Sequence, residues 1–253
     1  MTKVFVHGNP EVDALWGPLV DELGERGVDD VVLLSPPGFG APAPPDWDAT
    51  MRSYVEWLIG EIEAIAETTG DNIDLVGHDW GAGHVFGLLA DRPDLIRSYA
   101  VDVAGLIHED YVWHDMAQAW QTPEVGEQTI EGMVSASLED RTALFASMGV
   151  SPEIASALAA GVDEQMGRCI LALYRDAAQP ALAEMGKRVF AAERRPGLVI
   201  TATSDPYVST QLGSEVATRL GADELRLDGL GHWWMTEDPA SAATGLAEFW
   251  TNL

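Results

Sequence analysis

The chain has 253 residues, of which 47% are apolar and 22% are charged, as is usual for a globular protein. Its 41 acidic residues outnumber its 14 basic residues, which gives a formal net charge of −27. Such a surface repels nucleic acid and anionic lipid, so we expect neither as a partner. The excess of acid indicates a highly soluble or salt-adapted surface.

Membrane and secretory segments are not expected. No apolar run approaches the roughly 20 residues that a membrane span requires. The apolar run Val4–Val6 predicts a core strand close to the start of the chain, which argues against a signal peptide. The single cysteine, Cys169, has no partner for an internal disulfide and fits a reducing compartment. We therefore expect a cytoplasmic protein.

Short β-branched runs alternate with amphipathic stretches along the chain, which is typical of βαβ units around a parallel sheet. A helix is expected from about Pro18, since proline suits the first helical turn. Another is expected from Met51, with Thr50 as its N-cap, and the last from Pro239. The expected strands are residues 3–7, 30–35, 73–78, 98–103, 197–203 and 223–228.

The alternation of strands and helices stops at about residue 105 and resumes at about residue 180. This region has helical patterns rich in alanine and no convincing strand. Helices inserted near the carboxyl ends of parallel strands are expected to cover the ligand site. The sequence therefore predicts a core domain of residues 1–104 and 181–253, and a helical cap of residues 105–180.

The segment Gly77–Gly81 has the pattern of a nucleophile elbow, in which a strand turns sharply into a helix. The apex residue is Asp79, between Gly77 and Gly81, where other elbows carry serine. A carboxylate in this position can attack an electrophilic carbon and form an ester with it. An aspartate in a turn is by itself a weak signal, because aspartate is a common turn former.

A nucleophilic carboxylate needs a base, an acid that orients the base, and donors for the oxyanion. His232 directly follows the last predicted strand and is the candidate base, and Asp205, in a loop after the preceding strand, is the candidate acid. Asp102 and Asp228 are rivals for the acid. The expected oxyanion donors are the backbone N–H groups of two residues in loops that follow parallel strands, Asn9 and Trp80.

Together these motifs resemble the α/β-hydrolase superfamily, in its branch with aspartate nucleophiles. The resemblance implies an α/β fold with a helical cap and a reaction that needs no metal or organic cofactor. Because the chain starts at the family's third strand, about six strands are expected, all parallel. The matching pieces are His7-Gly-Asn-Pro-Glu11, Pro37-Gly-Phe-Gly40, Gly77-His-Asp-Trp-Gly81, Asp205 and Gly231-His232-Trp233.

The cap contains features that are similar to those of epoxide hydrolases. Gln121–Val125 is similar to a cap segment of that family, and Tyr174-Arg175 is similar to the pair that carries one of its two ring-opening tyrosines. A tyrosine can protonate the oxygen of an opening epoxide. Met116 stands where the second tyrosine is expected, and three nearby residues could substitute for it, namely Tyr111, Trp113 and His114.

Two alternatives stay open. In haloalkane dehalogenases, an asparagine after His-Gly and the tryptophan after the nucleophile hold the departing halide, and Asn9 and Trp80 match them. A fluoroacetate dehalogenase is not favoured, since no arginine follows Asp79 in the elbow. The expected partners are thus a small apolar epoxide or halogenated substrate and water. The remaining alternative is a ligand-binding protein without activity on the same fold.

Overall fold

The computed structural model describes all of residues 1–253, and a six-stranded parallel sheet forms its centre. The strand order is β2-β1-β3-β4-β5-β6, and every neighbouring pair is parallel. This confirms the predicted α/β fold with six parallel strands. The strands are β1 (Thr2–Val6), β2 (Val31–Leu34), β3 (Ile73–Gly77), β4 (Ser98–Val101), β5 (Gly197–Ala202) and β6 (Asp223–Leu227).

The register of the central strands determines which loops meet. β1 and β3 lie side by side, with Val6 opposite Gly77, so their following loops leave the sheet next to each other. Both strands are fully buried, which explains why apolar residues dominate them without alternation. The charged exceptions, Lys3 and Asp74, form an ion pair with each other. β4 is shorter than expected and ends at Val101, so that Asp102 lies in the loop after it.

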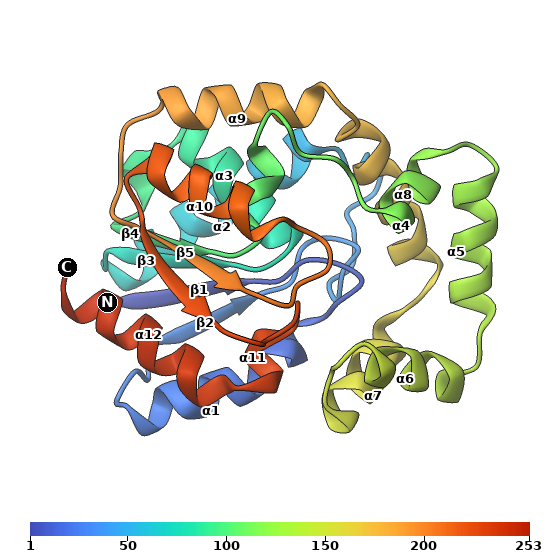
Figure 1. The fold of residues 1–253 in the computed structure, drawn as a ribbon, viewed down its shortest axis with the longest axis horizontal. Helices are drawn as coiled ribbons and strands as arrows, with labels where there is room; N and C mark the ends of the chain where they lie inside the picture. The colour runs from blue at the N-terminus through green and yellow to red at the C-terminus, as the bar shows by residue number, and fades with distance from the viewer.

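Helices cover both faces of the sheet (Figure 1). In the view of Figure 1, α1, α11 and α12 lie below it, and α2, α3, α9 and α10 lie above it. Short 3₁₀ helices occupy Asp13–Trp16, Pro93–Leu95 and Ala104–Ile107. The seven helices are α1 (Gly17–Glu25), α2 (Met51–Thr69), α3 (Trp80–Asp91), α9 (Ala181–Ala191), α10 (Thr210–Leu220), α11 (Trp234–Glu237) and α12 (Pro239–Thr251).

The helix boundaries agree with the signals in the sequence. Thr50 caps α2, as its side chain accepts a hydrogen bond from the N–H of Ser53 at 3.2 Å. The same helix ends at Gly70, whose φ of 68° is a left-handed conformation that glycine adopts without strain. Pro18 lies in the first turn of α1, and Pro239 begins α12.

Six α-helices lie between β4 and β5 in the chain, and five of them, all except α9, extend to one side of the sheet (Figure 1). They pack mainly on one another: α8 contacts α4 and α5, and α6 pairs with α7. Their N-caps include Ser137 for α6 and Asp163 for α8, which accept hydrogen bonds from the first turn. The inserted helices are α4 (Asp115–Gln121), α5 (Val125–Ser135), α6 (Leu138–Ser147), α7 (Pro152–Gly161) and α8 (Glu164–Asp176).

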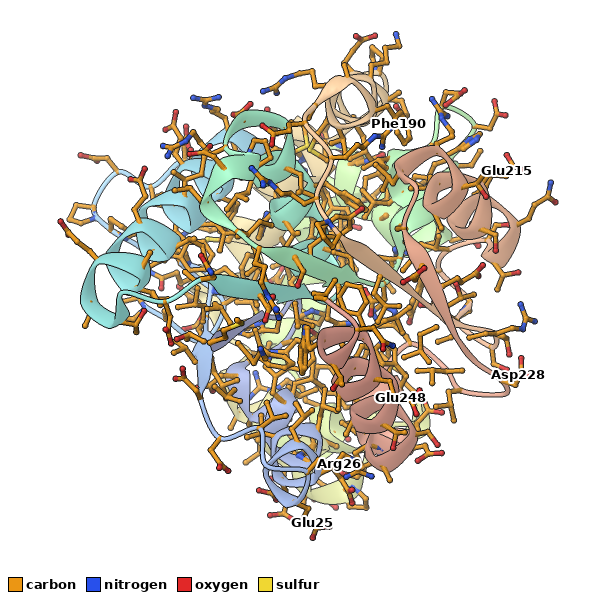
Figure 2. The ribbon with its side chains drawn as sticks, turned by 90° about the vertical axis from the view of Figure 1, so that its left-hand side faces the viewer. Glu25, Arg26, Phe190, Glu215, Asp228 and Glu248 are labelled. Atoms are coloured by element: carbon orange, nitrogen blue, oxygen red, sulfur yellow. The ribbon has the colours of Figure 1, made fainter.

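The acidic residues lie mainly on the outer faces of the helices. Figure 2 shows Glu25 on α1, Glu215 on α10 and Glu248 on α12, all pointing away from the core, with Asp228 after β6. All four side chains are exposed. In none of the helices does an apolar stretch reach the length that crossing a bilayer demands.

Candidate active site

Asp79 lies at the apex of the turn between β3 and α3. Its φ of 51° and ψ of −123° are unusual for a residue with a side chain, and they are the backbone strain that a tight elbow imposes. The glycines around it are sterically required. A Cβ on Gly81 would overlap the carbonyl oxygen of Val6, and a Cβ on Gly8 would overlap the Asp79 carboxylate. The elbow thus depends on close packing against the loop after β1.

The Asp79 carboxylate is held from two sides. Its Oδ1 accepts a hydrogen bond from the backbone N–H of Asn9 at 3.1 Å. Its Oδ2 lies 3.7 Å from Nε2 of His232. Burial raises the pKa of Asp79 to about 6, although the neighbouring His232 acts in the opposite direction. Trp80, the second expected oxyanion donor, is the first residue of helix α3. Its N–H makes no hydrogen bond to the Asp79 carboxylate.

His232 is oriented by Asp205. Nδ1 of His232 lies 2.8 Å from Oδ2 of Asp205, and Oδ1 of Asp205 accepts the N–H of Tyr207 at 2.8 Å. Burial works against a charge on His232, but the Asp205 carboxylate outweighs it and raises the pKa of His232 above its usual value. The rival acids lie elsewhere: Asp228 is exposed and pairs with Arg226.

Asp102, the other rival, belongs to a buried network behind the elbow. His78 lies between two carboxylates, with Nδ1 at Asp102 and Nε2 3.0 Å from Glu11. Indole N–H groups complete the network, since Trp233 donates to Glu11 and Trp234 donates to Asp102, both at 2.7 Å. Burial opposes a charge on His78, but the two carboxylates hold the pKa of His78 well above its usual range, so it is an imidazolium.

The network also contacts the two catalytic candidates, Asp79 and His232. Oδ1 of Asp102 accepts the backbone N–H of Asp79 at 3.0 Å, and the rings of His78 and His232 lie 4.6 Å apart. Burial acts to raise the pKa of Glu11, but the charge on His78 lowers that pKa to about 2. The elbow is therefore fixed by an ion cluster that carries one positive and two negative charges.

One group of side chains has the spacing of a metal site. Glu11, His78 and His232 each offer a ligand atom, and these atoms lie within 4.8 Å of one another. A metal needs a free imidazole lone pair. His78 has none, because both of its nitrogens are bonded to carboxylates. The donor set therefore does not fit a metal ion.

A cavity of about 440 Å³ lies between the sheet and the inserted helices. Asn9, Asp79, His232 and Trp233 line it from the core. The inserted helices form the remaining walls, and most of their lining residues are apolar. A cavity of this size, with a few converging polar groups, is typical of a small-molecule site.

Tyr174 connects the inserted helices to the elbow. It projects from α8, is almost fully buried, and contacts Trp80 edge to face at 5.5 Å. Trp113 and Trp120 pack around the same ring at 5.3 Å and 4.8 Å. Tyr174 lines the large cavity and a second, smaller one, and Asp79 also lines both. Burial and the nearby Asp79 carboxylate hold the pKa of Tyr174 well above its usual range, so it keeps its proton.

The other cap candidates occupy different positions around the elbow. Tyr111 and Trp113 line the smaller cavity beside Asp79, and the indole N–H of Trp113 is buried without a partner. His114 lines both cavities and caps α4, accepting the N–H of Ala117 at 3.3 Å. Burial lowers the pKa of His114 to about 4, so it is neutral at physiological pH.

The family model described as "Alpha/beta hydrolase family" matches residues 4–244. The chain belongs to this family. Among solved structures, this hydrolase is similar to haloalkane dehalogenase DbeA from Bradyrhizobium elkani, with a TM-score of 0.75 at 22% identity over 100% of this chain and 91% of the other. It is also similar to a laboratory-evolved variant of potato epoxide hydrolase, with a TM-score of 0.79 at 17% identity over 100% of this chain and 93% of the other.

Curated relatives of this hydrolase match shorter segments. A haloalkane dehalogenase of Bradyrhizobium diazoefficiens is 33% identical over 100 residues, which are 38% of this chain and 30% of the relative. A haloalkane dehalogenase of Mesorhizobium japonicum is 27% identical over 146 residues, which are 51% of this chain and 42% of the relative. The chain therefore matches less than half the length of either relative. The similarities support a hydrolase and leave its substrate open.

The side chain of Asn9 adds unpaired polar atoms to the hydrolase site. Both its Nδ2 and its Oδ1 are buried and have no hydrogen-bond partner within the protein. Asn9 lines the large cavity together with Asp79. A buried amide without partners is costly and is expected to serve a ligand. The side chain is thus available to a group bound at Asp79.

Sequence reasoning missed Tyr207, which lies beside the catalytic candidates. Its ring contacts His232 edge to face and His114 at an angle, both at 4.8 Å, and it lines both cavities. The available signal was its position two residues after Asp205. That signal is weak, because a loop residue two positions after an acid can point in any direction.

Proposed function

We propose that this hydrolase opens epoxides to vicinal diols through an alkyl ester on Asp79. Residues 105–180 serve as the cap over the core formed by residues 1–104 and 181–253. Asp79 is the nucleophile, Tyr174 the proton donor, His232 the base and Asp205 the acid that orients it. The reaction uses only these side chains, backbone N–H groups and water.

In the first step, a carboxylate oxygen of Asp79 attacks a ring carbon of the epoxide. Oδ1 is held by the Asn9 N–H, so Oδ2 forms the new C–O bond. The ring C–O bond breaks, and its electron pair leaves with the ring oxygen. Tyr174 transfers its hydroxyl proton to that oxygen. The product of this step is a hydroxyalkyl ester of Asp79.

In the second step, water hydrolyses the ester. His232 takes a proton from water through Nε2, and the resulting hydroxide attacks the carboxyl carbon of Asp79. The imidazolium is stabilised by Asp205, 2.8 Å from Nδ1. Oδ1 becomes the oxyanion, and the Asn9 N–H already bonds this atom. As the intermediate collapses, the bond between the carboxyl carbon and Oδ2 breaks, and the His232 imidazolium protonates Oδ2 to complete the departing diol. The second proton of the water, which stays on the new carboxyl oxygen, passes to Tyr174 and leaves Asp79 as a carboxylate.

The observation that carries the proposal is the position of Tyr174. A protonated phenol on the cap and the carboxylate of Asp79 line the same two cavities, so one substrate can touch both. Haloalkane dehalogenation needs no such proton, because halide is a stable leaving group. An epoxide does need it, since its alkoxide is strongly basic.

A second candidate is haloalkane dehalogenation by the same covalent steps. It is favoured by the unpaired Nδ2 of Asn9 and the unpaired indole N–H of Trp113, both at cavities that Asp79 lines. Donors without partners are suited to a departing halide, and Trp80, which follows Asp79 in the elbow, stacks on Trp113 at 5.9 Å. Two curated relatives carry the name haloalkane dehalogenase.

Matched substrates and variants separate the two reactions. The wild type is assayed with styrene oxide for diol and with n-butyl bromide for bromide. The Tyr174→Phe variant is expected to lose diol formation, and the Asn9→Ala variant is expected to retain it in part. Bromide release without diol formation, insensitive to Tyr174→Phe and abolished by Asn9→Ala, would instead establish the dehalogenase.

A further inference from the structure

The large cavity has two chemically different ends. At the core end are Asp79 and His232, in the loops after β3 and β6. The opposite end is formed by α5 and α6, which Figure 1 shows on the outer side of the inserted helices, away from the sheet. Most of this wall is apolar and includes Met133, Leu144 and Phe145. One strongly basic side chain interrupts it.

That side chain is Arg141, which projects from α6 and lines the cavity. Its Nη1 donates to the carbonyl oxygens of Val162 at 2.9 Å and Val134 at 3.4 Å. Its Nε is buried and has no hydrogen-bond partner. The guanidinium is therefore anchored at one corner, while its charge is not neutralised by any carboxylate of the protein.

This isolation is unusual in so acidic a chain. There are 14 lysines and arginines and 41 acidic residues, and all but two of the basic side chains form ion pairs. The two exceptions are Arg141 and Arg194. Arg194 is exposed at the surface, whereas Arg141 is half-buried at the cavity. A partly buried cation without a counter-charge carries a desolvation cost, which an acidic ligand would relieve.

The neighbouring Asp140 does not supply the missing charge. It lines the same wall, but its Oδ2 accepts the hydroxyl of Ser137 at 2.7 Å, and its N–H bonds the same hydroxyl at 3.1 Å. It belongs to the first turn of α6, where a negative charge interacts favourably with the helix N-terminus. Asp140 and Arg141 form no ion pair, so the guanidinium remains available.

We infer that Arg141 binds a carboxylate on the substrate, at the end remote from the carbon that Asp79 attacks. The substrate class is a chain with an electrophilic carbon at one end and a carboxylate at the other. The apolar wall between the two groups accommodates the chain. This inference rests on the proposed function, since it assigns the remote half of the same substrate. It also explains how a chain of net charge −27 could select an anion.

Ligand binding tests the inference without requiring any reaction. Butyrate, hexanoate, octanoate and decanoate are titrated by calorimetry into wild type and Arg141→Gln, with octanol as the neutral match to octanoate. Glutamine removes the charge and keeps an uncharged polar side chain. The control Arg194→Gln removes the same charge at the surface. We expect Arg141→Gln to weaken carboxylate binding roughly 10- to 100-fold and to leave octanol unchanged.

Two results would overturn the inference. One is that wild type binds octanoate no better than octanol. The other is that Arg141→Gln and Arg194→Gln weaken octanoate binding equally, as a general charge effect would. If Arg141→Gln does not fold, Arg141→Lys replaces it. Loss of the planar fork is then expected to weaken octanoate several-fold and to spare octanol.

Turnover separates this inference from the proposed function. The terminal epoxide of octanoate and the terminal epoxide of octane are compared in wild type and Arg141→Gln. We expect KM for the epoxy acid alone to rise roughly 10-fold or more, with kcat little changed. If neither epoxide reacts but octanoate binding depends on Arg141, the epoxide hydrolase proposal fails while the inference stands. If both epoxides react equally in both proteins, the inference fails alone.

Discussion

The two ends of the cavity are built by different means. At the core end, the nucleophile and the base of the proposed reaction are each fixed by a hydrogen bond from a strand-end loop: Asp79 by Asn9, and His232 by Asp205. At the cap end, polar atoms such as Nε of Arg141 are buried without partners. A preorganised end suits bond making and breaking, because it need not rearrange during reaction. An end with unpaired donors suits recognition, because the ligand completes it.

The largest expected effect is at the core end, in Asp79→Asn. Asparagine is nearly isosteric and tolerates a positive φ, so the elbow should persist. Without a nucleophile, turnover should fall roughly 10⁴-fold or more. The pKa of Asp79 is raised by folding, so its charge opposes folding at neutral pH, and we expect the variant to have a higher Tm.

Steady-state assays and thermal melts check this prediction. The gain in Tm should be present at pH 8 and shrink as pH falls through about 6, where the wild-type carboxyl takes up its proton. An active Asp79→Asn variant would contradict the covalent mechanism outright.

Tyr174→Phe comes next and tests whether the two ends cooperate in one reaction. Removing the hydroxyl leaves the ring packing against Trp80 and Trp113 intact. We expect styrene oxide turnover to fall roughly 10²- to 10⁴-fold, the usual contribution of a positioned acid. Stopped-flow measurement of the alkylation step locates the loss. Tyr111→Phe is the matched control, and an equal loss there would remove the special role of Tyr174.

The pH dependence should differ between the two half-reactions. Alkylation needs ionised Asp79, whose pKa is about 6, and so should fall about tenfold per pH unit below that value. Ester hydrolysis needs neutral His232, whose pKa is raised. As the pH is lowered, hydrolysis should therefore be lost before alkylation is. Between these two limits, the alkyl-enzyme should accumulate. Rapid-quench experiments at several pH values measure its amount, and an amplitude independent of pH would contradict the assignment.

The smallest expected effect is on stability, at the network behind the elbow. Glu11→Gln removes one of two carboxylates from the His78 imidazolium but keeps an acceptor for the Trp233 indole. We expect a loss of roughly 1–3 kcal/mol in the free energy of unfolding. Urea unfolding measures it. The control Glu248→Gln, on the exposed face of α12 in Figure 2, should change stability by less than about 0.5 kcal/mol.

The sequence was most informative where local chemistry and chain order restrict the choices. The strand boundaries were predicted to within one or two residues, because short runs rich in apolar residues alternate with helical stretches and turns. Asp79 was predictable from its flanking glycines, which the structure requires on steric grounds. Asp102 was placed inside a strand, although β4 ends at Val101 and leaves it free to bond His78. The pairing of Asp102 with His78 could not be predicted from their separation in the sequence.

The inserted helices, the proposed cap, were less predictable for a physical reason. The periodicity of a helix shows which of its faces is apolar, but it does not show which neighbouring element covers that face. Tyr174 was found through its resemblance to a family pair, and Tyr207 and Arg141 were not singled out at all. Arg141 becomes distinctive only in three dimensions, since the absence of a counter-charge is a property of its surroundings.

The most direct test of the central claim is to trap the ester on Asp79. His232→Gln keeps a buried polar side chain of similar size and removes the base, so the ester should form and persist. After incubation with styrene oxide and proteolysis, mass spectrometry should find one adduct, on the peptide that carries Asp79. No adduct with styrene oxide, or an adduct on a different residue, would contradict the account.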